Sequence, residues 1–164
     1  MILFFYLLIA LLWDLVQYRI PNWWIVVGCF LGLLEFALNG KMTVLDLGQG
    51  VLATSVLLIL FFLKVLGGGD VKVFYVAALF LGSETWRLIL LSFLLNGLYA
   101  LLKMLFQRDL TFRLYYFYGY VIQCFYQGKV SPYQSLESSK KDQVHFMVGI
   151  FFGYILFTKW RFFI

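Results

Sequence analysis

Short polar segments divide the chain into six apolar runs, and this pattern limits what it can fold into. The runs are Met1–Tyr18, Trp23–Leu38, Leu47–Leu66, Val71–Leu81, Trp86–Phe106 and Val144–Trp160. Hydrophobic residues make up 63% of the 164 residues and charged residues only 13%, which is more apolar surface than a soluble domain of this length can bury. Because about 20 apolar residues cross a bilayer as a helix, we predict an all-α, polytopic membrane protein with about six transmembrane helices.

The fourth run is too short to cross a bilayer by itself. Its 11 residues, Val71–Leu81, would reach about 17 Å as a helix, against roughly 30 Å of hydrocarbon. We therefore expect this helix to take residues from its flanks or to begin inside the protein.

The polar segment at residues 107–142 is broken by Gly119, Gly128 and Pro132. Its aromatic part favours an interfacial belt, and a seventh span within Phe112–Gln127 is the alternative. We interpret residues 1–164 as a single membrane-embedded domain with this polar and aromatic segment on the cytoplasmic side.

Basic residues indicate the orientation, because cytoplasmic segments carry an excess of Lys and Arg. With the N-terminus outside, nine of the thirteen basic residues fall on the cytoplasmic side. These nine are Arg19, Lys64, Lys72, Lys103, Arg108, Arg113, Lys129, Lys140 and Lys141, and the other four are Lys41, Arg87, Lys159 and Arg161. The net charge of +5 is thus explained by topology signals, and we expect no nucleic-acid partner.

This orientation brings two costly carboxyl groups to the same depth. Asp14 lies four residues before the end of the first run, and Asp70 lies at the junction of the third and fourth runs. An aspartate near lipid costs about 2.5 kcal/mol or more on insertion scales. The preceding glycines, Gly67, Gly68 and Gly69, each cost a helix roughly 1 kcal/mol relative to alanine. We expect a function that requires both features.

Two neighbouring aspartates are suited to proteolysis. Since two close carboxyl groups cannot both ionise easily, one is expected to keep a proton while the other stays charged. The charged member can take a proton from an attacking water, and the protonated member can donate a hydrogen bond to the developing oxyanion. This chemistry needs no metal and no cofactor, and we expect neither. The two cysteines, Cys29 and Cys124, have no paired spacing that would indicate a zinc site or a disulfide.

Other functions of these residues stay open on geometry alone. An aspartate near the end of a span can be a boundary residue, and we interpret Asp46 and Glu84 in this way. The Gly67–Asp70 segment can also bind an ion through backbone carbonyls, as in a small channel or transporter.

Two short motifs around the aspartates are more specific. "DLVQYRIPN", Asp14 to Asn22, places an aspartate six residues before Ile-Pro-Asn at a cytoplasmic turn. "GGGDVK", Gly67 to Lys72, is a Gly-x-Gly-Asp sequence that opens a helix. Together, in this order, they resemble the two signatures of the prepilin peptidase family, membrane aspartyl proteases of the Gly-x-Gly-Asp type. The six-helix pattern also matches, so the resemblance spans nearly the whole chain.

The resemblance implies a function and its residues. Asp14 and Asp70 would be the catalytic pair, and the substrate would be a prepilin or pseudopilin of a type IV pilus or related secretion system. Its short basic leader would be cut at the cytoplasmic face of the inner membrane, where lipid surrounds the enzyme. The other motif residues would support substrate binding or the motif itself: Pro21, Asn22, Gly67, Gly68, Gly69 and Lys72.

Departures from the family pattern limit what is carried over. Larger members have an N-terminal extension with paired cysteines and also methylate the new N-terminus, whereas here the first helix begins at residue 1. We therefore expect a small, peptidase-only form. His145, the only histidine, is expected to serve as an interfacial or hydrogen-bonding residue at the start of the last helix. A catalytically silent partner in pilus assembly is a third hypothesis, and the sequence does not give the oligomeric state.

Overall fold

The computed structural model describes residues 1–39, 42–63, 65–106 and 145–161, together with Tyr115, Tyr118 and Ile122. Apart from those three residues, the predicted segment 107–142 and the alternative seventh span lie outside the described residues. Over the described ranges every regular element is a helix, which confirms the all-α class. The chain divides into two compact units, Met1–Asn96 with His145–Ile164, and Gly97–Val144.

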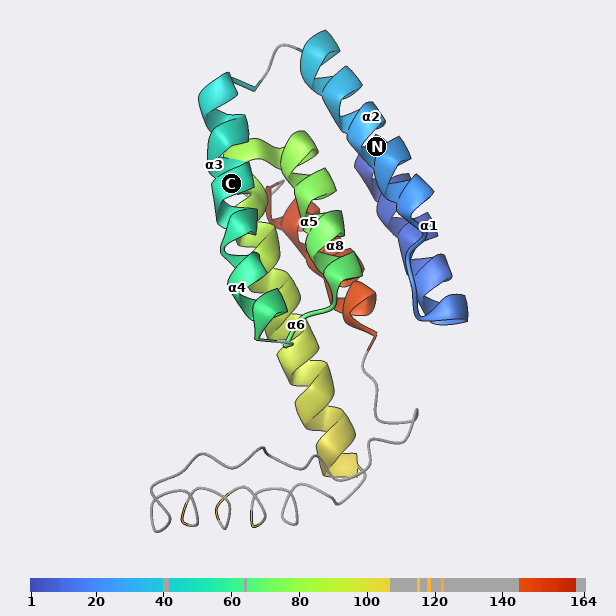
Figure 1. Cartoon of the computed structure of the whole chain (residues 1–164), viewed down its shortest axis with the longest axis vertical. Helices are drawn as coiled ribbons and strands as arrows, with labels where there is room; N and C mark the ends of the chain where they lie inside the picture. Colours follow the sequence, from blue (N-terminus) through green and yellow to red (C-terminus); the bar gives the residue numbers. More distant parts are fainter. Residues whose placement is uncertain are drawn as a thin grey trace. The chain divides into compact units, whose positions relative to one another are not determined.

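The described helices follow the six predicted apolar runs within a few residues. They are α1 (Ile2–Gln17), α2 (Asn22–Asn39), α3 (Val44–Ser55), α4 (Leu57–Phe62), α5 (Gly68–Leu81), the 3-10 helix η1 (Gly82–Glu84), α6 (Thr85–Phe106) and α8 (Phe146–Arg161). Within the first unit the chain reverses direction at each connection, if α3 and α4 are counted as one rod (Figure 1). The C-terminal end of α1 and the N-terminal end of α5 therefore lie at the same end of this unit.

The third predicted run is two helices rather than one. α3 ends at Ser55 and α4 begins at Leu57, with Val56 between them. The hydroxyl groups of Thr54 and Ser55 donate to the carbonyls of Gly50 and Val51, at 2.9 and 2.8 Å. Such bonds back to the preceding turn often bend helices, which accounts for a break at this point.

A capping box begins α3. The Asp46 carboxylate accepts hydrogen bonds from the Thr43 backbone N–H at 3.0 Å and from the Thr43 hydroxyl at 2.8 Å. The Asp46 N–H in turn donates to the Thr43 hydroxyl oxygen at 3.2 Å. Asp46 is therefore a helix-capping residue at the third position of α3, in agreement with its interpretation as a boundary residue.

α5 is the central helix of the first unit. It packs against α2 and α3, while α1 packs against α8. Most of its side chains after the first turn are buried, which is typical of a helix surrounded by others. The buried residues of α5 are Val71, Val73, Phe74, Val76, Ala77 and Ala78.

The outer helix surfaces are also apolar. Val26 and Phe30 on α2 are 68% and 65% exposed, and Phe62 on α4 is 78% exposed. Apolar surface of this extent is typical of a face that meets lipid or another protein.

Among the described residues, two helical stretches are long and apolar enough to cross a membrane, Val44–Phe62 and Gly68–Lys103. The second contains η1, where Gly82 has a φ of 55° and the chain turns back from α5 into α6 (Figure 1). Three further apolar helices in the described part of the chain are shorter: Ile2–Gln17, Asn22–Leu38 and Phe146–Lys159. The total of about six spans stays a prediction.

Candidate active site

The first aspartate motif forms the end of α1 and the turn into α2. Asp14 lies in the last turn of α1, and its backbone carbonyl accepts a hydrogen bond of 2.9 Å from the Tyr18 N–H. Tyr18 ends the helix in the left-handed conformation, with a φ of 53°. Pro21, which cannot donate a backbone hydrogen bond, immediately precedes the start of α2 at Asn22. The sequence thus ends one helix and begins the next within a few residues of Asp14.

The second aspartate motif forms the first turn of α5. Gly67 is the N-cap, and Asp70 stands at the third position of the helix. A Cβ atom at Gly67 would lie 2.9 Å from Asp70 Oδ2, closer than real Cβ contacts come. The absence of a side chain at Gly67 therefore lets the Asp70 carboxyl group fold back over the helix end. The predicted fourth helix takes these residues from its flank, and it begins at Gly68 rather than at Val71.

A hydrogen bond joins the two motifs. The Lys72 ammonium group donates to Asn22 Oδ1 at 2.9 Å, although the two residues lie 50 positions apart in the chain. Lys72 is two residues beyond Asp70, and Asn22 begins the helix that follows Asp14. The contact therefore ties the α1–α2 turn to the first turn of α5.

Residues of both motifs line one pocket of about 690 Å³. All the residues that the two motifs suggested as catalytic or supporting line this pocket, and four others of the first motif line it as well. The described lining residues are Asp14, Gln17, Tyr18, Arg19, Ile20, Pro21, Asn22, Gly67, Gly68, Gly69, Asp70 and Lys72.

The pocket combines two acidic and two basic side chains. Asp14 and Asp70 are partly buried, and Asp14 lies close enough to Asp70 for its charge to act on that carboxyl group. Arg19 and Lys72 line the same pocket and are exposed. Paired carboxyl groups beside a wet cavity can share a proton and act on a bound water molecule.

The other acidic residues of the helix ends have structural partners. Asp46 caps α3, as described above. Glu84 forms an ion pair of 2.7 Å with Arg87, one turn further along the chain. Neither is among the described residues of the pocket, which agrees with their interpretation as boundary residues. In the part of the chain that the structure describes, no group of three His, Cys, Asp or Glu side chains is placed to hold a metal ion.

The sequence interpretation missed how close His145 lies to the site. Its Nδ1 lies 3.2 Å from Asp14 Oδ2, and the two residues are 131 positions apart. The expected hydrogen-bonding role is therefore correct in kind, but the partner is one of the two candidate carboxyl groups. The only available signal was the position of a single histidine at the start of the last helix, at the predicted level of Asp14.

Over the described residues, fold and site together define an all-helical protein with apolar outer surfaces and two carboxyl groups in one pocket at the helix ends. A sequence model described as the type IV leader peptidase family matches residues 1–105, which include every described residue of the pocket. The chain therefore belongs to the type IV leader peptidase family, and it is a membrane-associated peptidase. Comparisons with curated proteins and with solved structures give no significant match.

Proposed function

We propose that this chain is an aspartic endopeptidase that removes the short basic leader of prepilin-like or pseudopilin proteins. The observation that carries the proposal is that Asp14 and Asp70, from helices far apart in the sequence, line one pocket. Family membership supports the type of substrate, and the paired carboxyl groups support the aspartic type of chemistry.

In the proposed mechanism the two aspartates activate water without a covalent intermediate. The ionised carboxylate takes a proton from a bound water molecule as its oxygen attacks the scissile carbonyl carbon. The protonated carboxyl group donates a hydrogen bond to the carbonyl oxygen, which gains negative charge in the tetrahedral intermediate. When the carbon–nitrogen bond breaks, the leaving amine takes a proton and the pair returns to its starting state.

The first turn of α5 gives an extended substrate room to approach. Gly67, Gly68 and Gly69 line the pocket without side chains, so a peptide backbone can come close to Asp70. The volume of about 690 Å³ falls within the range of roughly 300–1,000 Å³ typical of ligand pockets. Asn22 and Lys72 act in support by holding the two turns of the pocket together, and Pro21 acts in support as part of the turn that leads into α2.

The membrane arrangement is part of the proposal. Residues 1–164 form one peptidase domain of about six spans in the cytoplasmic membrane, with the pocket facing the cytoplasm. The alternating helix directions in Figure 1 and the apolar outer surfaces support this arrangement. We propose peptidase activity alone, and mass spectrometry of the cleaved product would detect any methylated N-terminus.

The proposal is tested by co-expressing the chain with candidate prepilins encoded near it and scoring a mobility shift of the substrate. N-terminal sequencing of the product then locates the cut. The proposal predicts removal of the leader at one position by the wild-type chain. Substrates that stay intact beside a properly inserted chain contradict it.

Two other outcomes would favour the alternative functions. Ion conductance in reconstituted bilayers, together with uncut substrates, would favour a channel that uses the Gly67–Asp70 segment. Normal prepilin processing in a strain that lacks the chain would favour a catalytically silent assembly partner.

A further inference from the structure

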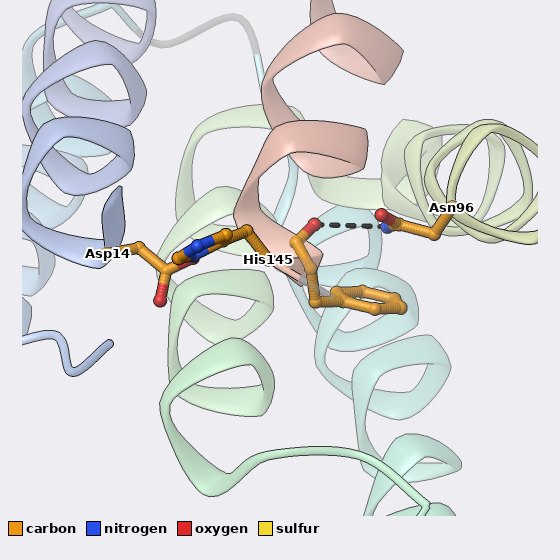
Figure 2. Close-up of polar contacts among 4 residues, drawn as sticks. Asp14, Asn96 and His145 are labelled. Atoms are coloured by element: carbon orange, nitrogen blue, oxygen red, sulfur yellow. Dashed lines mark hydrogen bonds and ion pairs between the residues drawn. The ribbon is translucent and has the colours of Figure 1, made fainter. Parts of the chain in front are cut away.

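His145 contacts Asp14 from outside the pocket. The described residues that line the pocket do not include it, and its ring approaches Asp14 from the start of α8. The His145 side chain is 18% exposed and that of Asp14 is 14% exposed, so water competes little for their contact of 3.2 Å. Figure 2 shows one carboxyl oxygen of Asp14 directed toward the His145 ring and the other directed away from it.

The His145 ring is itself held by Tyr18. The two rings stack with centroids 4.4 Å apart and planes inclined by 28°. Tyr18 is the only non-glycine residue with a positive φ among those described, a conformation that costs a bulky residue about 1–2 kcal/mol. Its N–H donates to the Asp14 backbone carbonyl. Asp14 is thus fixed through its backbone by Tyr18 and through its side chain by His145.

The backbone beside His145 is anchored to α6. The Asn96 amide donates to the Phe146 carbonyl at 3.0 Å, the bond drawn as a dashed line in Figure 2. The Phe146 ring packs against Phe93 of α6, with ring centroids 5.2 Å apart, and against Phe74 of α5 at 6.3 Å. A side chain at Gly149 would collide with Asn96, so the glycine allows this close approach. The position of His145 is therefore set by contacts on two other helices.

We propose that His145 is a positioning residue for Asp14 in the proposed peptidase reaction. With Asp14 ionised, the Nδ1–H of His145 donates to Oδ2 and fixes the rotation of the carboxylate. The other oxygen, Oδ1, then faces the water that it deprotonates. His145 touches neither water nor substrate in this role, which rests on the function proposed above. The family match ends at residue 105 and assigns nothing to His145.

The contact can be tested without any measurement of cleavage. Because His145 is the only histidine, a chain labelled with ¹⁵N in its histidine rings gives resonances from this residue alone. In the full chain reconstituted in lipid nanodiscs, Asp14→Asn is expected to shift the Nδ1 resonance, since an amide replaces the carboxylate acceptor. Asp46→Asn, the same change at a distant helix cap, is expected to leave it in place. An Nδ1 resonance that is the same in both variants and in the wild type would overturn the contact.

The positioning role is tested by two substitutions of His145 with different donors. His145→Leu removes the ring N–H and is expected to lower kcat by about 10- to 100-fold with KM nearly unchanged, since misplacing a reacting group by about 1 Å can cost this much. His145→Asn keeps an N–H donor near the position of Nδ1 and is expected to recover most of the lost kcat.

The possible outcomes separate this inference from the proposed function. If Asp14→Asn abolishes cleavage while properly inserted His145→Leu keeps wild-type kcat, only the positioning role is wrong. A loss in KM alone, or no recovery in His145→Asn, also overturns it. A wild-type chain that cuts no prepilin contradicts the proposed function and the role of His145 in it, while the ring resonances still decide whether the contact exists.

Discussion

At the residue scale, the position of the Asp70 carboxyl group depends on the absence of a side chain at Gly67. Gly67 has a φ of −70° and a ψ of 141°, a backbone conformation that any residue can adopt. Glycine is therefore not required there for its backbone freedom. A Cβ at this position would lie 2.9 Å from Asp70 Oδ2, so the carboxyl group would have to move.

We therefore predict that Gly67→Ala lowers prepilin cleavage by about tenfold or more, because it displaces one catalytic carboxyl group. Gly48→Ala is the matched control, since a Cβ at Gly48 meets no atom within 4 Å. The control is expected to keep full activity and to stabilise α3 by about 0.5–1 kcal/mol. Cleavage rates and thermal unfolding of both variants check this, and equal rates would contradict the role given to Gly67.

The residues that line the site were largely predictable, because the two motifs contain both the aspartates and the turn residues beside them. Asp14 and Asp70 were singled out by their predicted common depth in the membrane and by the motifs around them. The contact of His145 with Asp14 was not predictable in the same way. It joins residues 131 positions apart, and no local pattern encodes which helix start will lie beside which helix end.

At the element scale, the Lys72–Asn22 hydrogen bond holds the α1–α2 turn against the first turn of α5. We predict that Lys72→Met and Asn22→Ala each lower cleavage by about fivefold, the equivalent of roughly 1 kcal/mol for one hydrogen bond. The double variant is expected to be no worse than either single variant, since both remove the same contact. Purified variants assayed at saturating and limiting substrate give the required rates.

Arg87→Met provides the control for the loss of a cation. It breaks the ion pair with Glu84 at the connection between α5 and α6, and neither residue is among those described around the pocket. Wild-type cleavage is expected in this variant. Additive losses for Lys72→Met and Asn22→Ala would show that the two residues act separately.

Helix positions followed from the apolar runs and the polar segments between them, whereas some boundaries did not. The prediction that the short fourth helix takes residues from its flank was correct, and α5 begins within the glycine run, at Gly68. The break between α3 and α4 was missed, because it depends on hydroxyl groups that bond to backbone carbonyls inside an apolar run.

At the scale of the whole molecule, the proposed arrangement predicts the side of the membrane for each connection. Reporter fusions after Arg19, Lys64 and Lys129 are expected to report the cytoplasm, and fusions after Lys41 and Trp160 the outside, because nine of thirteen basic residues then lie inside. A fusion after Trp160 that reports the cytoplasm would require a seventh span within Phe112–Gln127. Opposite results for Arg19 and Lys64 would contradict the shared depth of Asp14 and Asp70.

Which helix is surrounded by the others could not be predicted from the sequence. All the runs are similarly apolar, so composition does not indicate that α5 is surrounded while α2 and α4 expose Phe30 and Phe62. Lipid-facing and core-facing side chains have the same chemistry in a membrane protein, which removes the contrast that marks the core of a soluble domain.

The central claim is that Asp14 and Asp70 act as one catalytic unit, and their asparagine variants test it most directly. Asparagine keeps the size of the side chain and removes its carboxylate chemistry. Asp46→Asn is the matched control, since Asp46 and Asp70 both occupy the third position of a helix, and Asp46 is not among the described residues that line the pocket.

The measurement is the rate of prepilin cleavage by the wild type, Asp14→Asn, Asp70→Asn, the double variant and Asp46→Asn, each checked for membrane insertion. The account predicts that each single variant loses about 10²- to 10⁴-fold in rate, that the double variant is scarcely worse, and that the control stays active. Near wild-type cleavage by an inserted Asp14→Asn or Asp70→Asn chain, or small losses that add in the double variant, would contradict it.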